Sequence, residues 1–129
     1  MFNIKISNLI KTSIFVILFT HFSVLFSQDS FGGLALYTVR EDMGKDSKAT
    51  LQAVAEAGYV NIEAAGYDNG KFYDYTPQEF KALLRSLNLT PLSSHNSSVS
   101  LDNADKMIAD VKAAGFEYFV VPIPPMGLF

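Results

Sequence analysis

Short apolar segments alternate along this chain with longer segments in which apolar residues recur every three or four positions. The longer pattern is typical of helices with one buried face, and the short continuous pattern is typical of parallel strands covered on both faces. Each of three such helices is followed by one residue that tolerates a left-handed backbone, and then by a strand. These turn residues are Gly58, Asn88 and Gly115, spaced 30 and 27 positions apart, about one strand-plus-helix unit. The spacing predicts a parallel α/β fold.

Four strands are expected to form the sheet, at residues 34–39, 59–64, 89–94 and 116–121. Right-handed crossovers place each strand beside the preceding one, so we expect the parallel order 1-2-3-4. Pro91 cannot donate to a strand ladder and therefore predicts an irregularity in or near the third strand. Residues 40–45 are polar and are expected to form a loop between the first strand and the first helix.

Three helices are expected between these strands, and the second has the most specific start signal. Thr76 can cap that helix, Pro77 suits its first turn, and Glu79 is placed to complete a capping box. The first helix is expected to begin at a cap formed by Asp46 or Ser47. The third is expected to begin at Ser100 or Asp102 and to bury one face, formed by Ala104, Met107, Ile108 and Val111.

The amino-terminal segment has the composition of a secretory signal peptide. Two lysines precede an uncharged, apolar run at residues 12–26, and Ser27 is a small residue suited to the end of the signal. An uncleaved membrane anchor is the alternative, but the run is shorter than the ~20 residues that a spanning helix needs. We therefore expect a signal peptide at 1–27, one domain at 28–129, and an exported protein that is periplasmic or secreted.

Cysteine content and charge indicate how the exported domain folds and which class of partner it avoids. The sequence contains no cysteine, so the domain would fold without disulfides. Removing the signal peptide removes two lysines and no acidic residue, which changes the net charge from −3 to −5. A surface of this sign repels nucleic acid, so no nucleic-acid partner is expected.

Polar residues at the carboxyl ends of the strands are the candidate site, because ligands bind there in parallel α/β folds. The candidates are Tyr37 and Arg40 after the first strand, Glu63 ending the second, and His95 with Asn96 ending the third. A carboxylate and an imidazole on neighbouring strands can act as acid and base or can hold sugar hydroxyls. Purely structural roles for either residue remain the alternative.

The segment at 65–75 is longer than a connecting loop requires and is rich in Gly, Asn, Asp and aromatic residues. It is expected either to help bind a ligand or to be a surface loop that its own aromatic side chains hold in place. No phosphate-binding glycine loop and no nucleophile elbow occur in the sequence. Because His21 lies in the signal peptide, His95 and Glu63 are the only plausible metal donors at the expected face, and this chain alone is not expected to hold a metal.

Several of these segments, in this order, resemble the amino-terminal half of sugar phosphate isomerase/epimerase proteins, which are xylose isomerase-like TIM barrels. The resemblance covers roughly residues 31 to 125. The residues that carry it are Ile62-Glu63-Ala64-Ala65-Gly66-Tyr67, Phe72-Tyr73, Thr76-Pro77-Gln78-Glu79-Phe80-Lys81-Ala82-Leu83-Leu84 and Leu92-Ser93-Ser94-His95.

The resemblance implies isomerisation or epimerisation of a sugar or sugar-like substrate by proton transfer next to a carbonyl group. In such proteins a divalent metal (Mn, Mg or Zn) holds the substrate oxygens, and later strands supply its ligands and the acid/base glutamates. The residues that carry over are therefore those that would bind substrate: Glu63, His95 and, less directly, Tyr37.

A complete barrel needs ~250 residues and eight strand-helix units, whereas four strands and three helices are expected here. We therefore expect a partial (β/α)8 barrel that lacks activity on its own and that self-associates through unpaired strand edges. A non-enzymatic, exported sugar-binding module is the alternative function.

Overall fold

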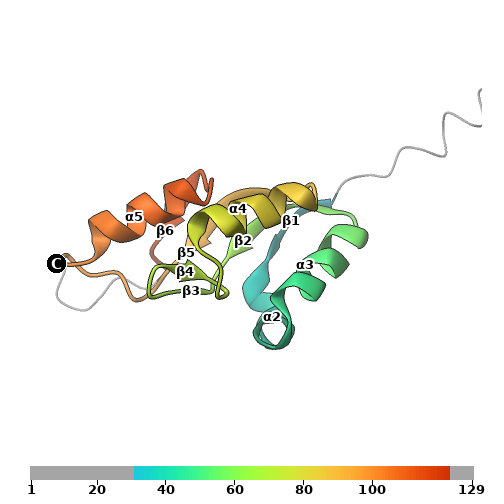
Figure 1. Cartoon of the computed structure of the whole chain (residues 1–129), viewed down its shortest axis with the longest axis horizontal. Coiled ribbons are helices and arrows are strands. Elements are labelled where there is room, and N and C mark those ends of the chain that lie inside the picture. Colours follow the sequence, from blue (N-terminus) through green and yellow to red (C-terminus); the bar gives the residue numbers. More distant parts are fainter. Residues whose placement is uncertain (1–30, 123–129) are drawn as a thin grey trace, which may run out of the picture.

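The computed structural model describes residues 31–122 of the chain. The predicted signal peptide at 1–27 and the last seven residues, 123–129, lie outside the described residues. Four parallel strands form one sheet, with the sequential order β1-β2-β5-β6 (Figure 1). The predicted α/β class and strand order are therefore confirmed. The strands are β1 (Phe31–Ala35), β2 (Tyr59–Ala64), β5 (Thr90–His95) and β6 (Tyr118–Val120).

Helices connect these strands and cover one face of the sheet, with α3 packed on β2 and α4 on β5 (Figure 1). The predicted turn residues all follow helices and all have a positive φ: 94° at Gly58, 56° at Asn88 and 90° at Gly115. A left-handed residue at each of these places lets the chain leave the helix and enter the next strand directly. The three long helices are α3 (Ser47–Glu56), α4 (Pro77–Ser86) and α5 (Ala104–Ala113).

The predicted helix starts are confirmed for the first two long helices. The Asp46 side chain accepts a hydrogen bond from the Ala49 amide at 2.9 Å and caps α3. At α4 the capping box is complete, because Thr76 accepts from the Glu79 amide and Glu79 accepts from the Thr76 amide. These bonds fix where α4 begins and so fix how it lies on the sheet.

The expected first strand at 34–39 is wrong in its position. The β1 ladder with β2 ends at the pair Ala35–Glu63, next to the end of β2, and Leu36–Val39 then forms a 3-10 turn, η1. The expected loop at 40–45 is a short helix, α2 (Arg40–Lys45). The apolar run at 34–39 is therefore divided between the end of a strand and a 3-10 turn, and Leu36 of η1 and Met43 of α2 are both buried.

The expected boundaries elsewhere need smaller corrections. Helix α5 begins at Ala104, later than expected. It follows a turn in which Asn103 accepts a hydrogen bond from the Ser100 amide at 2.7 Å. Ile108 was expected on the buried face of α5, but its side chain is 49% exposed. The irregularity expected near Pro91 is present as a register shift, because Ile62 pairs with Pro91 and the next residue of β2 pairs with Ser93.

The segment at 65–75 folds back as a small antiparallel hairpin of β3 (Tyr67–Asp68) and β4 (Lys71–Phe72). Phe72 is fully buried and stacks on Phe80 of α4, with their ring centroids 5.4 Å apart. Tyr73 and Tyr75 also contact the Phe80 ring. These aromatic side chains hold the segment against the core, so they are not free to grip a ligand.

The core lies between the sheet and its helices. Its fully buried large side chains include Leu36, Leu51, Ile62, Phe72, Phe80 and Leu84. None of the helices described is long and apolar enough to span a bilayer.

Candidate functional site

The carboxyl ends of the two inner strands, β2 and β5, bring three polar side chains together. Glu63 pairs with Ser93 across the parallel ladder, and His95 lies two residues after Ser93. Because side chains alternate between the faces of a strand, Ser93 and His95 share one face. On β2, Ile62 and Ala64 are buried and therefore leave Glu63 on the face opposite the helices.

Both carboxylate oxygens of Glu63 accept hydrogen bonds. Oε1 lies 2.7 Å from His95 Nδ1, and Oε2 lies 2.7 Å from the Ser93 hydroxyl, which donates to it. Burial alone would raise the pKa of Glu63, but the bonds from Ser93 and His95 outweigh it and lower this pKa below its ordinary value. Glu63 is therefore ionised at neutral pH and can only accept.

This pairing determines which nitrogen of His95 faces a ligand. An ionised carboxylate has no proton to give, so the proton between the two groups belongs to His95 Nδ1. The other ring nitrogen, Nε2, is then the acceptor in the neutral imidazole. The His95 side chain is 21% exposed. Glu63 thus positions the ring, and Nε2 is the group that can take a proton from a bound hydroxyl.

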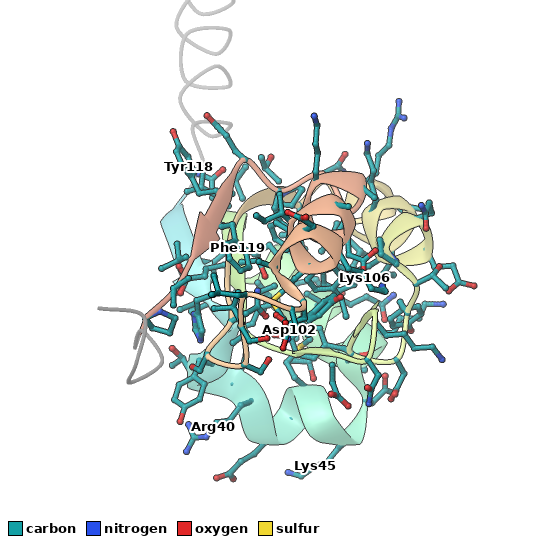
Figure 2. All side chains as sticks on the ribbon, turned by 90° about the vertical axis from the view of Figure 1, so that its left-hand side faces the viewer. Arg40, Lys45, Asp102, Lys106, Tyr118 and Phe119 are labelled. Atoms are coloured by element: carbon teal, nitrogen blue, oxygen red, sulfur yellow. The ribbon has the colours of Figure 1, made fainter. Side chains whose placement is uncertain are left out.

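The remaining sequence candidates differ in where they lie. Tyr37, on η1, brings its ring centroid to 6.1 Å from that of His95, and 57% of its surface is exposed. The Arg40 guanidinium lies 4.7 Å from the Tyr37 ring centroid and projects outward (Figure 2). Asn96 is buried and donates to the Ser94 hydroxyl, so it supports the structure and does not face the site.

The structure thus brings Tyr37, Glu63 and His95 together, with Arg40 at the rim; their role in binding substrate stays a prediction. Two contributors were not identified from the sequence. Ser93 holds Glu63, and its position two residues before His95 on a strand is the signal that could have indicated it. Tyr73 accepts a hydrogen bond from the Ala65 amide at 2.9 Å and so fixes the backbone just beyond Glu63; no local pattern marks it.

Among residues 31–122 there is no group of three or more His, Cys, Asp or Glu side chains that could hold a metal ion. Each Glu63 oxygen accepts one hydrogen bond and His95 uses Nδ1, so further lone pairs of the carboxylate and the His95 Nε2 atom are the donors that the pair could offer to a metal. These residues could therefore contribute to a metal site only together with ligands from outside residues 31–122.

No protein-family model and no curated protein matches this sequence. Two solved structures titled sugar phosphate isomerase/epimerase, both from Parabacteroides distasonis ATCC 8503, do match it. Each is 25% identical with a TM-score of 0.59, and they cover 72% and 77% of this chain. This chain spans 41% of the length of each. In sequence and in fold, the chain is therefore similar to part of the TIM-barrel sugar phosphate isomerase/epimerase proteins.

Proposed function

We propose that this chain forms the substrate-binding side of an exported sugar isomerase/epimerase. The single observation that carries the proposal is the Glu63–His95 pair at the carboxyl ends of adjacent parallel strands, the end where ligands bind in this class of fold. The likeness to sugar phosphate isomerase/epimerase structures supports a sugar as the substrate. Isomerisation and epimerisation of sugars proceed by proton transfer, and His95 Nε2 is available for a proton.

In this proposal four side chains have different tasks. His95 Nε2 accepts a hydrogen bond from a sugar hydroxyl, while Glu63 and Ser93 hold the ring in one tautomer. The exposed Tyr37 ring, 6.1 Å from the His95 ring, offers an apolar surface to the C–H face of the sugar. His95 and Tyr37 together therefore favour a ligand that has a hydroxyl donor next to a flat apolar face.

A divalent metal, Mn, Mg or Zn, would polarise the substrate oxygens when bound in the complete protein. The described residues supply too few donors for a firm site. We therefore expect that the 129-residue chain alone binds neither Mn²⁺ nor Zn²⁺ with submicromolar affinity and shows no turnover. A calorimetric titration that gives one equivalent of submicromolar metal would contradict this expectation.

The binding proposal is tested with ketose and aldose monosaccharides in the presence and absence of Mn²⁺ or Mg²⁺. We expect wild-type chain to bind a sugar and His95→Gln to bind it at least tenfold more weakly. Arg85→Ala is the matched control, since Arg85 is exposed near the carboxyl end of α4, away from the site. Equal affinity in wild type and His95→Gln would contradict the site, and binding with turnover by the chain alone would show that it is a complete enzyme.

We also propose that the protein is exported after cleavage behind Ser27, on the basis of the apolar run at 12–26. Mass spectrometry of the protein from the cell envelope or medium should give an amino terminus at Gln28 or within a few residues of it. Intact chain that stays in the cytoplasm would contradict the proposal.

We propose further that the chain self-associates through its outer strands. Within the described residues β1 pairs only with β2, and β6 pairs only with β5. Tyr118 and Val120 are exposed on β6, and Tyr118 points away from the body of the domain (Figure 2). Such an edge is a template for another strand. Sedimentation should show dimers or larger species, and a monomer that withstands high concentration would contradict this.

A further inference from the structure

A groove lies at one edge of the sheet, between β1 with its η1 turn and the exposed side of α3. Its volume is about 600 Å³. β1 and η1 contribute the half-buried side chains of Leu34 and Val39. From α3 come three exposed alanines, Ala49, Ala53 and Ala57, which follow one another at intervals of four residues. The groove is therefore mainly apolar and is open to solvent along α3.

The polar groups in the lining are already bonded to neighbours and do not call for a polar ligand. Asp42 is the one charged residue of the lining, and its carboxylate lies 3.0 Å from Lys45 Nζ. The Thr50 hydroxyl donates to the Asp46 carbonyl at 2.8 Å. Contiguous apolar surface of this kind marks a place where another protein segment binds.

The opposite edge of the sheet carries large apolar side chains that project into solvent. Tyr118 and Val120 of β6 are 54% and 36% exposed, and Ile108 of the nearby α5 is 49% exposed. Figure 1 shows α5 and β6 at one end of the domain and α3 at the other. β1 and β6 are the outermost strands of the sheet, so the groove and this apolar edge do not meet within one copy.

The segment 123–129, which lies outside the described residues, follows β6 in the sequence and matches the groove in chemistry and length. It reads Ile-Pro-Pro-Met-Gly-Leu-Phe and has no charged side chain. Seven extended residues span at most ~25 Å, whereas α3 from Ala49 to Ala57 is ~12 Å long. The segment can therefore cover the groove. To reach the groove of its own copy it would first have to cross the whole sheet.

We propose that residues 123–129 of one copy lie in this groove of a second copy, with β6 of the first copy beside β1 of the second. Four parallel strands are half of the eight in a closed (β/α)8 barrel. Two copies that join in this way at both edges form a closed ring, which leaves no strand edge free. The inference rests on the self-association proposed above and names the surfaces that meet.

The same arrangement completes the site at His95. Val120 of β6 pairs with His95 in the ladder, so within one copy the site is open on the side of β6. The η1 turn follows β1 directly, and a second copy with β1 beside β6 therefore brings its η1 turn to this open side. Each copy thus borders the site of the other.

Disulfide cross-linking tests the contact directly, because the sequence contains no cysteine and each introduced thiol is unique. Full-length Ala53→Cys chains are mixed with tagged Met126→Cys chains and mildly oxidised. We expect a disulfide between the two kinds of chain, formed at least fivefold faster than when Gln52→Cys replaces Ala53→Cys. Gln52 is the matched control, since it is exposed next to Ala53 and does not line the groove.

Two results of this experiment would overturn the proposal. One is equal cross-linking of Ala53→Cys and Gln52→Cys with Met126→Cys. The other is a disulfide that forms only within a chain that carries both Ala53→Cys and Met126→Cys, because the segment 123–129 would then fill the groove of its own copy.

Charged variants test the same contact without a covalent bond. Ala53→Glu and Met126→Asp each place an acid in the apolar contact and should weaken the association at least tenfold in sedimentation. Gln52→Glu should leave it unchanged. Ala53 is an exposed helical position that accepts glutamate, so the variant is compatible with the fold. Association that both acidic variants retain would overturn the groove contact and leave the pairing of strand edges intact, and a wild-type chain that stays monomeric would contradict both.

Discussion

The inner strands, β2 and β5, and the outer strands, β1 and β6, differ in how firmly their residues are held. Each inner strand pairs on both sides within the described residues, and each outer strand pairs on one side. The inner pair carries Glu63, Ser93 and His95, whose polar atoms bond to one another. The outer strand β6 presents Tyr118, which is 54% exposed. A polar pair can be held in one geometry where neighbours constrain the backbone from both sides.

Packing beneath the strands strengthens the same contrast. The Phe72 and Phe80 rings lie between the hairpin segment and α4, and both side chains are fully buried. They support the backbone that leaves β2 directly after Glu63. On β6, Phe119 packs against the core while Tyr118 does not, as Figure 2 shows. Substitutions in the inner region should therefore cost far more than substitutions at the outer edge.

The largest effect is expected for Phe80→Ala. Removing a fully buried aromatic ring that four other aromatic rings contact leaves a cavity and should lower the free energy of unfolding by about 3–5 kcal/mol. Tyr118→Ala, at the outer edge, should change it by less than about 0.5 kcal/mol. Urea unfolding followed by circular dichroism measures both, and equal losses would remove the contrast between the regions.

Gly66→Ala should have the next largest effect. A Cβ at this position would lie 2.1 Å from the Tyr73 ring, so the ring that fixes the end of β2 must move. Overpacking of this kind should cost about 1–3 kcal/mol. Gly44→Ala is the control, because nothing lies within 4 Å of a Cβ there. Thermal unfolding compares the two, and a neutral Gly66→Ala would show that Tyr73 does not hold this backbone.

Glu63→Gln should have a smaller effect and lower the free energy of unfolding by about 1.5 kcal/mol. The substitution keeps the shape of the side chain and weakens two charge-assisted hydrogen bonds. Glu117→Gln, next to the outer strand β6, is the matched control and should be nearly neutral. If urea unfolding gives equal losses for Glu63→Gln and Glu117→Gln, the hydrogen bonds of Glu63 contribute no more to stability than an exposed glutamate does.

The smallest effect concerns pH. The Glu63 pKa is lowered in the folded state, so the stabilisation is fully present above the ordinary value of 4.5 and is lost as pH falls through the lower folded pKa. Ser93→Ala removes one of the bonds that lower this pKa and should move the loss to higher pH. Carboxyl ¹³C titration by NMR follows Glu63 directly, and an unchanged midpoint in Ser93→Ala would contradict the assigned cause.

The sequence predicted the regular parts of the fold because their signals are local. The three left-handed turn residues set the unit length, and the bounds of β2 at 59–64 are as predicted. The capping box at Thr76 depends on two residues three positions apart, so the sequence alone could predict it. That Glu63 and His95 lie near each other also followed from the sequence, since carboxyl ends of adjacent parallel strands meet at one edge; their direct contact is seen in the structure.

Other features depend on distant partners and could not be predicted. The position of β1 is set by its ladder with β2. Its residues Gly32 and Gly33 are of a type that is more common in loops than in strands, so the sequence does not indicate a strand there. The bond from Ser93 to Glu63 depends on the register shift after Ile62, of which Pro91 gives only a hint. The exposure of Ile108 depends on what packs on α5, which the helical period alone does not decide.

The central claim is that Glu63 holds His95 with Nδ1 protonated and Nε2 directed to a sugar. The ¹⁵N shifts of the His95 ring measure this directly, with His21→Gln used to assign the signals of the chain's two histidines. We predict the Nδ1–H tautomer in the free chain, its loss in Glu63→Gln, and a shift of the Nε2 signal when a sugar binds. An Nε2–H tautomer in the free chain, or an Nε2 signal that saturating sugar leaves unchanged, would contradict the account.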